Sequence, residues 1–246
     1  MKISTENLNM TYSKETKALQ DISLKIEGPG VVGILGPKDA GKSTLIKLLI
    51  GELQAESGRI FVDDIPLFKI KTKLKETLGY LPQSLVIYDE LNVWQFLDYI
   101  AVLKKIKNRK KAIKEVLQKT NLIDKQEAYI STLSVGEKQQ IGIAQALLGI
   151  PKLLIFDEPT ARISKEEISN FYKLISQTAK ESTILLATNV IEDMESICDK
   201  LVVISEGRIL FNGNPEDLLS LVSNNAQKLT FKAAYIQLIG KEVLKL

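Results

Sequence analysis

The chain has 246 residues, of which 45% are hydrophobic and 26% charged, as in ordinary globular proteins. Its 33 basic and 30 acidic residues give a net charge of +3, which is too balanced to require a polyanion, so we expect no nucleic-acid partner. Because the chain has no histidine and a single cysteine, Cys198, histidine general bases, cysteine metal sites and disulfides are excluded, and a reducing cytosolic setting fits.

Strand and turn signals alternate through the first third of the chain. Apolar and β-branched residues predict strands in the stretches MKISTENLNMTY, ALQDISLKI, VVGIL and GRIFVDD. Residues 71–83 are predicted to form a short basic helix that leads into LGYLPQ. From about Leu91 to Gly149 the pattern is helical, and it begins with an apolar stripe formed by Val93, Phe96, Leu97, Ile100 and Leu103.

Strand signals return after Lys152. The stretches KLLIF, STILLAT, KLVVIS and RILF are predicted strands, and a turn at Glu206-Gly207 joins the last two. A helix from Ser164 to Lys180 lies between the first two strands. The economical interpretation is an α/β core interrupted by a helical insertion.

Residues 36–44 read GPKDAGKST and fit the phosphate-binding pattern G-x-x-x-x-G-K-[ST]. A buried strand precedes them and a helix follows, so backbone N–H groups and the helix dipole can hold phosphate oxygens. Lys42 is expected to reach the terminal phosphates and the Ser43 hydroxyl to ligate Mg²⁺, whereas a simple glycine turn would explain neither residue. We assign nucleotide binding to Gly36, Pro37, Lys38, Asp39, Ala40, Gly41, Lys42, Ser43 and Thr44.

The stretch LLIFDEPT places two carboxylates at the end of a predicted buried strand. In a phosphate site Asp157 is expected to hold Mg²⁺, directly or through water, and Glu158 to polarise the attacking water. An Asp-Glu pair after a strand can also simply cap a loop. Its pairing with the phosphate-binding loop favours nucleotide hydrolysis.

Three further segments carry a family resemblance. From about Ile3 to Leu219 the chain resembles the ATP-binding subunits of ATP-binding cassette (ABC) transporters. Gln83 in LGYLPQ matches the family's glutamine loop, which contacts Mg²⁺ and water and couples to the membrane partner. The run LSVGEKQQIGIAQALL is similar to the family signature, so that Ser134 and Gly136 would contact ATP bound to the opposite subunit. Tyr12 falls where an aromatic side chain stacks on adenine.

This resemblance implies a P-loop NTPase fold of the α/β class, with a RecA-like core, an N-terminal antiparallel β subdomain and a helical insertion. It implies one nucleotide-binding domain over residues 1–246. Within it, residues 1–84 and 152–220 would form the catalytic core, 85–151 the helical subdomain and 221–246 a C-terminal tail.

The resemblance also implies cofactors and partners. ATP and Mg²⁺ are the expected cofactors. LNVWQFLDYIAVLKKIK and NVIEDMESICDKLVVISEGRILFNGNPEDLL look most like the export-type subfamily. Its members pair with a separate integral-membrane permease and with a second ATP-binding subunit, at the cytoplasmic face of the cell membrane.

Several positions depart from the family pattern. Lys38 and Asp39 replace Asn and Gly in the phosphate loop, but Asp tolerates a left-handed backbone, so the loop shape can survive. In the signature, Val135 and Glu137 replace Gly and Gln. Ser134 and Glu137 form an S-x-x-E pattern, which is a capping box for the following helix.

Two departures lie closer to the chemistry. Ser164 replaces an Asp that contacts the other subunit in the family, and with Glu167 it forms a second capping box. Asn189 stands where the family has a switch histidine, and we assign it a catalytic contact to the γ-phosphate. Neutral hydrogen bonds contribute about 0.5–1.5 kcal/mol and charged ones about 1.5–3 kcal/mol. Hydrolysis is therefore expected to be slower by about tenfold.

The favoured function is thus an ATP-binding, slowly ATP-hydrolysing subunit that powers export. The joint changes at Val135, Ser164 and Asn189 leave open a degenerate ATP-dependent clamp that relies on a more complete partner subunit. A soluble DNA-associated cassette ATPase is a third interpretation, which the chain length and the lack of a coiled-coil pattern oppose.

Two surface features are weighed separately. The basic run KKIKNRKKAIK, from Lys104 to Lys114, is interpreted as a solvated helix face, because no aromatic residues are interleaved as in a nucleic-acid patch. Contact with anionic lipid is a further alternative for this run. Trp94 lies off the apolar stripe and is interpreted as core packing, with a groove for the membrane partner as the alternative.

Overall fold

The structure is a computed structural model that describes residues 1–13, 16–222 and 230–243. Within these residues the strands form two sheets, with orders β2-β1-β4-β5 and β10-β9-β3-β8-β7-β6. The strands are β1 (Lys2–Ser13), β2 (Thr16–Glu27), β3 (Gly30–Leu35), β4 (Ser57–Val62), β5 (Ile65–Pro66), β6 (Leu78–Leu81), β7 (Leu153–Asp157), β8 (Thr183–Thr188), β9 (Lys200–Ser205) and β10 (Arg208–Gly213).

The two sheets differ in strand direction. Neighbouring strands of the four-stranded sheet are antiparallel. In the six-stranded sheet β6, β7, β8, β3 and β9 run parallel, and only β10 pairs antiparallel with its neighbour β9. This mixed α/β arrangement, with an antiparallel β subdomain beside a parallel sheet, confirms the fold that the sequence predicts.

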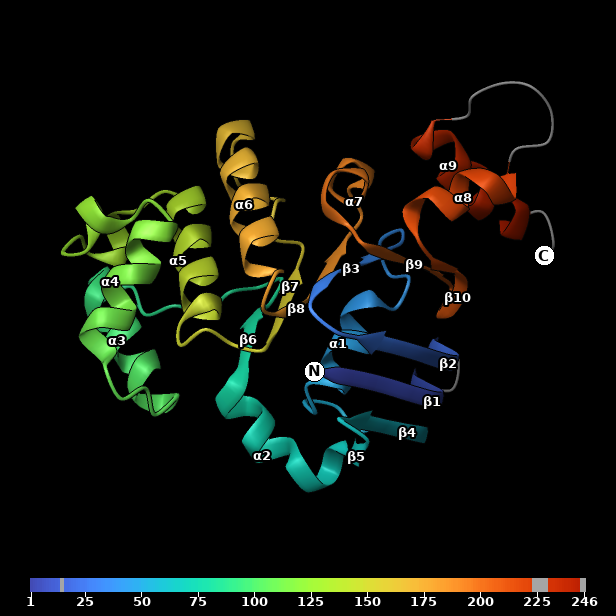
Figure 1. Ribbon diagram of the computed structural model, residues 1–246, viewed down its shortest axis with the longest axis horizontal. Helices are drawn as coiled ribbons and strands as arrows, with labels where there is room; N and C mark the ends of the chain where they lie inside the picture. The colour runs from blue at the N-terminus through green and yellow to red at the C-terminus, as the bar shows by residue number, and fades with distance from the viewer. Residues whose placement is uncertain (14–15, 223–229, 244–246) are drawn as a thin grey trace.

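Helices connect and cover the parallel strands. They are α1 (Lys42–Leu49), α2 (Leu67–Thr77), α3 (Val93–Leu103), α4 (Arg109–Lys119), α5 (Val135–Leu147), α6 (Lys165–Thr178), α7 (Ile191–Ile197), α8 (Pro215–Val222) and α9 (Phe231–Val243). Short 3₁₀ turns occupy Ile123–Lys125 and Ile130–Thr132. Figure 1 shows α3, α4 and α5 grouped at one end of the molecule, beyond β6, while the antiparallel sheet lies on the side of α1.

Side chains of the parallel strands alternate between two hydrophobic cores. In β7, Leu154 and Phe156 belong to one core, and Leu153 and Ile155 belong to the other. This period of two is what a strand covered on both faces requires. Each fully buried aliphatic or aromatic side chain contributes about 1.5–3 kcal/mol to folding.

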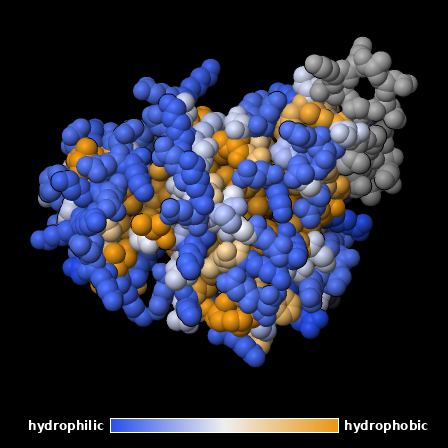
Figure 2. Space-filling model, viewed as in Figure 1, coloured by the Kyte–Doolittle hydropathy of each residue, from blue (hydrophilic) through white to orange (hydrophobic). Residues whose placement is uncertain are grey.

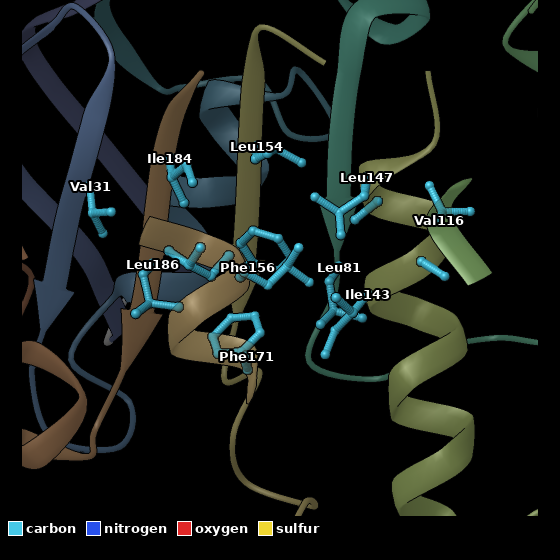
Figure 3. Close-up of a cluster of buried hydrophobic side chains, with 14 of the residues drawn as sticks. Val31, Leu81, Val116, Ile143, Leu147, Leu154, Phe156, Phe171, Ile184 and Leu186 are labelled. Atoms are coloured by element: carbon cyan, nitrogen blue, oxygen red, sulfur yellow. The ribbon is translucent and has the colours of Figure 1, made fainter. Parts of the chain in front are cut away.

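The first core joins the sheet to the helices. Ile143 and Leu147 of α5 lie beside Leu81 of β6, as Figure 3 shows. Phe171 of α6 packs edge-on against Phe156 of β7, with ring centroids 5.4 Å apart. The position of α5 and α6 against the sheet is therefore set by buried apolar contacts.

Both predicted capping boxes are present. The Ser134 hydroxyl accepts a hydrogen bond from the Glu137 N–H at 3.2 Å, and the Ser164 hydroxyl accepts one from the Glu167 N–H at 3.3 Å. In each pair the glutamate also accepts the N–H of its serine. Helices α5 and α6 begin directly after these serines.

Two predicted helices differ from the structure. The basic helix α2 begins at Leu67 rather than residue 71 and ends at Thr77, because Leu78–Leu81 pair with β7 as strand β6. In α3, Leu103 is 58% exposed and does not belong to the buried stripe, since it is the last residue of the helix, whereas Ala101 is buried.

The basic run from Lys104 to Lys114 is largely solvated, and Figure 2 shows mostly hydrophilic residues over this end of the molecule. Lys104 is an exception, because its Nζ donates to the carbonyl oxygens of Gln145 and Leu148, each at 3.2 Å, and so caps the end of α5. Trp94 is half-buried and packs against the first core.

The predicted division into catalytic core, helical subdomain and tail stays a prediction. Of the tail, residues 223–229 and 244–246 lie outside the described residues. Helix α8 extends into the tail as far as Val222, and α9 follows from Phe231 to Val243 and packs against α8 and α7.

Candidate functional site

Three parallel strands end at the same edge of the sheet. Leu35, the last residue of β3, pairs with Thr188 of β8, and Asp157 of β7 pairs with Ala187. The residues that follow these strands therefore meet at one place, which is where parallel α/β sheets bind their ligands. The phosphate-binding loop follows β3, Glu158 follows β7 and Asn189 follows β8.

The loop from Gly36 to Gly41 has the backbone that its sequence predicts. Asp39 has a φ of 64° and Gly41 a φ of 104°, so both lie in the left-handed region. A Cβ on Gly41 would come within 2.6 Å of the Ala18 carbonyl oxygen, and one on Gly36 within 2.2 Å of the Ile204 carbonyl oxygen. Glycine is required at both positions, and the expectation that Asp39 tolerates its backbone is confirmed.

Lys42 projects into the concavity of this loop. Its Nζ donates to the carbonyl oxygens of Gly36 at 2.8 Å and Pro37 at 2.9 Å. Nζ also lies 3.7 Å from Oε1 of Glu158, and the two side chains are only 6% and 11% exposed. Burial lowers the pKa of Lys42, although the Glu158 and Asp157 carboxylates oppose that shift.

Asp157 has an unsatisfied buried oxygen. The residue is 1% exposed, and its Oδ1 has no hydrogen-bond partner among the described residues. Burial raises the pKa of this carboxyl, and a hydrogen bond with the Ser43 hydroxyl partly offsets the rise. A buried carboxylate oxygen beside a hydroxyl fits Mg²⁺, which favours oxygen ligands and few of them from protein.

A site for Mg²⁺ here would need ligands beyond the protein. Among the described residues there is no group of three His, Cys, Asp or Glu side chains that could hold a metal ion. Mg²⁺ usually completes its coordination with water and substrate phosphates, which agrees with a cation held by Ser43, Asp157 and a nucleotide.

Glu158 is held in an unusual backbone conformation. Its φ is 53°, and its N–H donates to the Ala187 carbonyl oxygen at 2.8 Å. Its Oε2 accepts hydrogen bonds from the Thr188 hydroxyl at 3.1 Å and from the Asn189 N–H at 3.3 Å. A left-handed backbone is uncommon for glutamate, and such strain concentrates at functional sites.

Lys42, Ser43 and Glu158 line one cleft of about 560 Å³. The predicted site residues on its wall are Tyr12, Lys38, Asp39, Gly41, Lys42, Ser43, Thr44, Gln83, Glu158 and Asn189. The Tyr12 hydroxyl lies 3.2 Å from the Thr44 hydroxyl, which places the aromatic ring at the start of the phosphate-binding helix. A larger groove of about 720 Å³ lies along the antiparallel sheet, but it contains neither the loop nor the acid pair, so the chemistry favours the smaller cleft.

The remaining predicted residues lie outside the cleft wall. Gly36, Pro37, Ala40 and Asp157 belong to the loop and strand end behind it. Ser134 and Gly136 stand at the start of α5 and do not line the cleft, so the contact that the family resemblance implies for them cannot be made within this pocket.

Sequence reasoning missed three residues of the cleft wall, Lys17, Ala18 and Ala161, and gave Arg162 no role in the site. Lys17 and Ala18 reach the cleft because β2 passes close to the phosphate loop, where the Ala18 carbonyl faces Gly41. Ala161 and Arg162 follow the acid pair directly. No local motif marks Lys17 or Ala18. Ala161 and Arg162 could have been identified, because they lie close to Glu158 in the sequence.

A glycine loop between β3 and α1, a buried aspartate and a strained glutamate define the P-loop nucleoside triphosphatases as the class of this protein. The profile of one family, described as "ABC transporter", matches residues 19–161. The chain belongs to this family as an ATP-binding subunit, and it is an ATPase.

Two relatives and one solved structure illustrate the similarity. The chain is 29% identical to the lipopolysaccharide export system ATP-binding protein LptB of Haemophilus influenzae, over 89% of this chain and 92% of LptB. It is 30% identical to the methionine import ATP-binding protein MetN of Carboxydothermus hydrogenoformans, over 88% of this chain and 67% of MetN. A structure of an ATP-binding subunit of an ABC transporter superposes with a TM-score of 0.87 at 24% identity, over 97% of this chain and 100% of that one.

Exporters and importers thus both occur among the relatives, so the family assignment does not fix the direction of transport. In the described part of the chain, no helix is both long enough and apolar enough to cross a membrane.

Proposed function

We propose that this chain slowly hydrolyses MgATP to power export by a separate membrane permease. The position of Asn189 carries the proposal of slow hydrolysis. This residue follows β8, lines the cleft and donates its backbone N–H to Glu158, which supports a contact between its side chain and the terminal phosphate. An asparagine amide offers a neutral hydrogen bond where the family has a histidine, which predicts a turnover about tenfold lower.

Each remaining site residue then has a role. The loop N–H groups and Lys42 would bind the phosphates, and Tyr12 would stack on the adenine. Ser43 and Asp157 would hold Mg²⁺, which neutralises charge on the phosphates when bound, and Gln83 would contact it through the cleft. Glu158 would polarise the attacking water, because its carboxylate is held at the cleft wall by Thr188 and Asn189.

The start of α5 supports the proposal of a two-subunit arrangement. Ser134 and Gly136 lie away from the cleft of their own chain, and Val135 between them is 61% exposed. In a head-to-tail pair, this segment of one subunit would close over the ATP of the other. ATP would drive closure and hydrolysis would reopen the pair.

Export at the cytoplasmic face of the membrane is supported by sequence similarity alone. The segments after residues 90 and 188 resemble export-type subunits, and LptB is itself named for an export system. Purification of the tagged chain from membranes, followed by identification of the attached subunit, tests the proposal. Recovery of a permease of an uptake system would contradict it.

A degenerate clamp is the second candidate, and the segment that contains Ser164 favours it. The Ser164 hydroxyl accepts the Glu167 N–H and so caps α6. It carries no charge and is shorter than an aspartate, so it does not replace the contact that the family's aspartate makes with the other subunit. Such a chain would bind ATP and close without turning over. The third interpretation, a DNA-associated ATPase, has no support in the structure.

Phosphate release by the wild type and by Glu158→Gln tests hydrolysis. We expect release to vanish in Glu158→Gln while ATP affinity is kept. Glu166→Gln is the matched control, because Glu166 is an exposed glutamate of α6 outside the cleft. Wild-type release no higher than that of Glu158→Gln, with ATP bound, would instead identify the degenerate clamp.

A further inference from the structure

A buried carboxylate lies behind the proposed hydrolysis site. Asp193, in the first turn of α7, is 1% exposed. One of its oxygens accepts a hydrogen bond from the Thr160 hydroxyl at 2.6 Å, and the other accepts one from the Tyr172 hydroxyl. These two hydroxyls and the N-terminal end of α7 offset the cost of burying the carboxyl group.

The Thr160–Asp193 hydrogen bond joins the two segments that carry the proposed chemistry. Thr160 lies two residues after Glu158, in the loop between β7 and α6. Asp193 lies four residues after Asn189, at the start of the helix that follows β8. Because the bond is buried and charge-assisted, it fixes the distance between these segments more firmly than a surface contact would.

The same loop is held from a second side. The Gln139 amide of α5 is 5% exposed and donates to the Pro159 carbonyl oxygen at 3.1 Å. Pro159 and Thr160 are thus anchored to α5 and α7 respectively. The first residues of the loop that begins at Glu158 are therefore hydrogen-bonded to both helices.

Glu158 needs such support because of its backbone. A non-glycine residue in the left-handed region persists only where its surroundings impose that conformation. Directly after Glu158, the Pro159 carbonyl accepts from Gln139, and the next residue, Thr160, contributes the first side-chain hydrogen bond of the loop, to Asp193. Release of Thr160 would let the Glu158 carboxylate drift from the position that Thr188 and Asn189 define.

We propose that Asp193 is a positioning residue for ATP hydrolysis, which acts through Thr160 to hold the Glu158 loop opposite Asn189. This inference rests on the proposed function, in which Glu158 polarises the attacking water. The alternative is that Asp193 and its hydroxyl partners only stabilise the fold.

Thr160 and Tyr172 offer a matched comparison, because each donates one hydroxyl to the same carboxylate. Thr160 belongs to the Glu158 loop, whereas Tyr172 belongs to α6. Thr160→Val and Tyr172→Phe each remove that hydroxyl and keep the shape of the side chain. A purely structural role predicts the same effect for both, and a positioning role predicts a difference in turnover.

The experiment measures kcat, KM for MgATP and thermal unfolding of the full chain. We expect Thr160→Val and Asp193→Asn to lower kcat by about tenfold with KM changed less than about twofold, since losing one charge-assisted hydrogen bond is of that size. Tyr172→Phe should lower the melting temperature as Thr160→Val does and keep kcat within about twofold. The double variant Thr160→Val/Asp193→Asn should be no slower than Asp193→Asn, as expected for two partners of one bond.

Two results would overturn the inference. One is an equal loss of kcat in Tyr172→Phe and Thr160→Val, and the other is normal turnover of Thr160→Val under conditions where Glu158→Gln is inactive. The variant Glu158→Gln distinguishes failure of the proposed hydrolysis site from failure of the proposed role of Asp193. If it hydrolyses ATP as fast as the wild type, the proposed site fails, whereas its inactivity beside an active Thr160→Val refutes only the role of Asp193.

Discussion

Asn189→His should raise the rate of ATP hydrolysis. Asn189 follows Thr188, whose register with Leu35 of the phosphate-loop strand fixes the backbone, so a histidine introduced there starts from the same Cα position. Asn189 lines the cleft, and its backbone N–H donates to Glu158. A protonated imidazole would donate a charged hydrogen bond in place of the neutral amide, a gain of about 1–1.5 kcal/mol. If this gain is felt only in the transition state, kcat rises by about tenfold.

The pH dependence provides an internal check. An unperturbed histidine has a pKa of about 6.5, so the gain should grow as the pH falls from 8 towards 6 and the imidazole becomes charged. The assay is phosphate release at saturating MgATP over that pH range, for the wild type, Asn189→His and Asn189→Gln. Glutamine is the control for side-chain length without charge. No gain for histidine, or an equal gain for glutamine, would show that the missing charge at position 189 does not limit the rate. Other changed residues of the site would then account for slow hydrolysis.

Three further predictions follow from the geometry of the site and of α5. Gly41→Ala should abolish ATP binding measured by calorimetry. The new Cβ would lie 2.6 Å from the Ala18 carbonyl oxygen, and the backbone at this position is left-handed. Retained affinity would contradict this position of the loop. Asp157→Asn should make ATP affinity insensitive to Mg²⁺ titration while raising thermal stability without ligand, since it removes a buried charge; a wild-type Mg²⁺ response would exclude Asp157 as a ligand. The Lys125 ammonium and the Ser134 hydrogen bonds lower the pKa of Glu137 from 4.5 to about 2, so its stabilisation is complete above the unfolded value and lost as the pH falls towards 2. Acid unfolding followed by circular dichroism should therefore show a smaller loss of stability across that window in Glu137→Gln, and an unchanged acid transition would show that Glu137 does not contribute.

The sequence predicts those parts of the site that depend on short-range rules. The phosphate loop, its left-handed Asp39 and the two capping boxes each follow from residues within a few positions of one another. The resemblance to ABC ATP-binding subunits rests on the order of the phosphate loop, LGYLPQ, LSVGEKQQ and LLIFDEPT, and it implies the α/β fold. Local patterns specify these features because the backbone conformation is itself local.

The features that the sequence did not predict depend on contacts between distant segments. Lys104 looks like one more solvated lysine, yet it caps a helix that ends more than forty residues later in the chain. The bond between Thr160 and Asp193 spans 33 positions and carries no sequence signature. Leu103 fits the helical period, and only the end of α3 shows that it is exposed.

The capping box at α5 bears on the proposed contact between two subunits. The Glu137 carboxylate accepts the Ser134 N–H and pairs with Lys125 at 2.7 Å, so this helix end carries its own resident anion. A phosphate of ATP bound to another subunit would compete with the Glu137 carboxylate for the positive end of the α5 dipole. In the proposed two-subunit arrangement, closure around ATP would replace the Glu137 carboxylate by a phosphate, and its strength would depend on how readily Glu137 leaves the helix end.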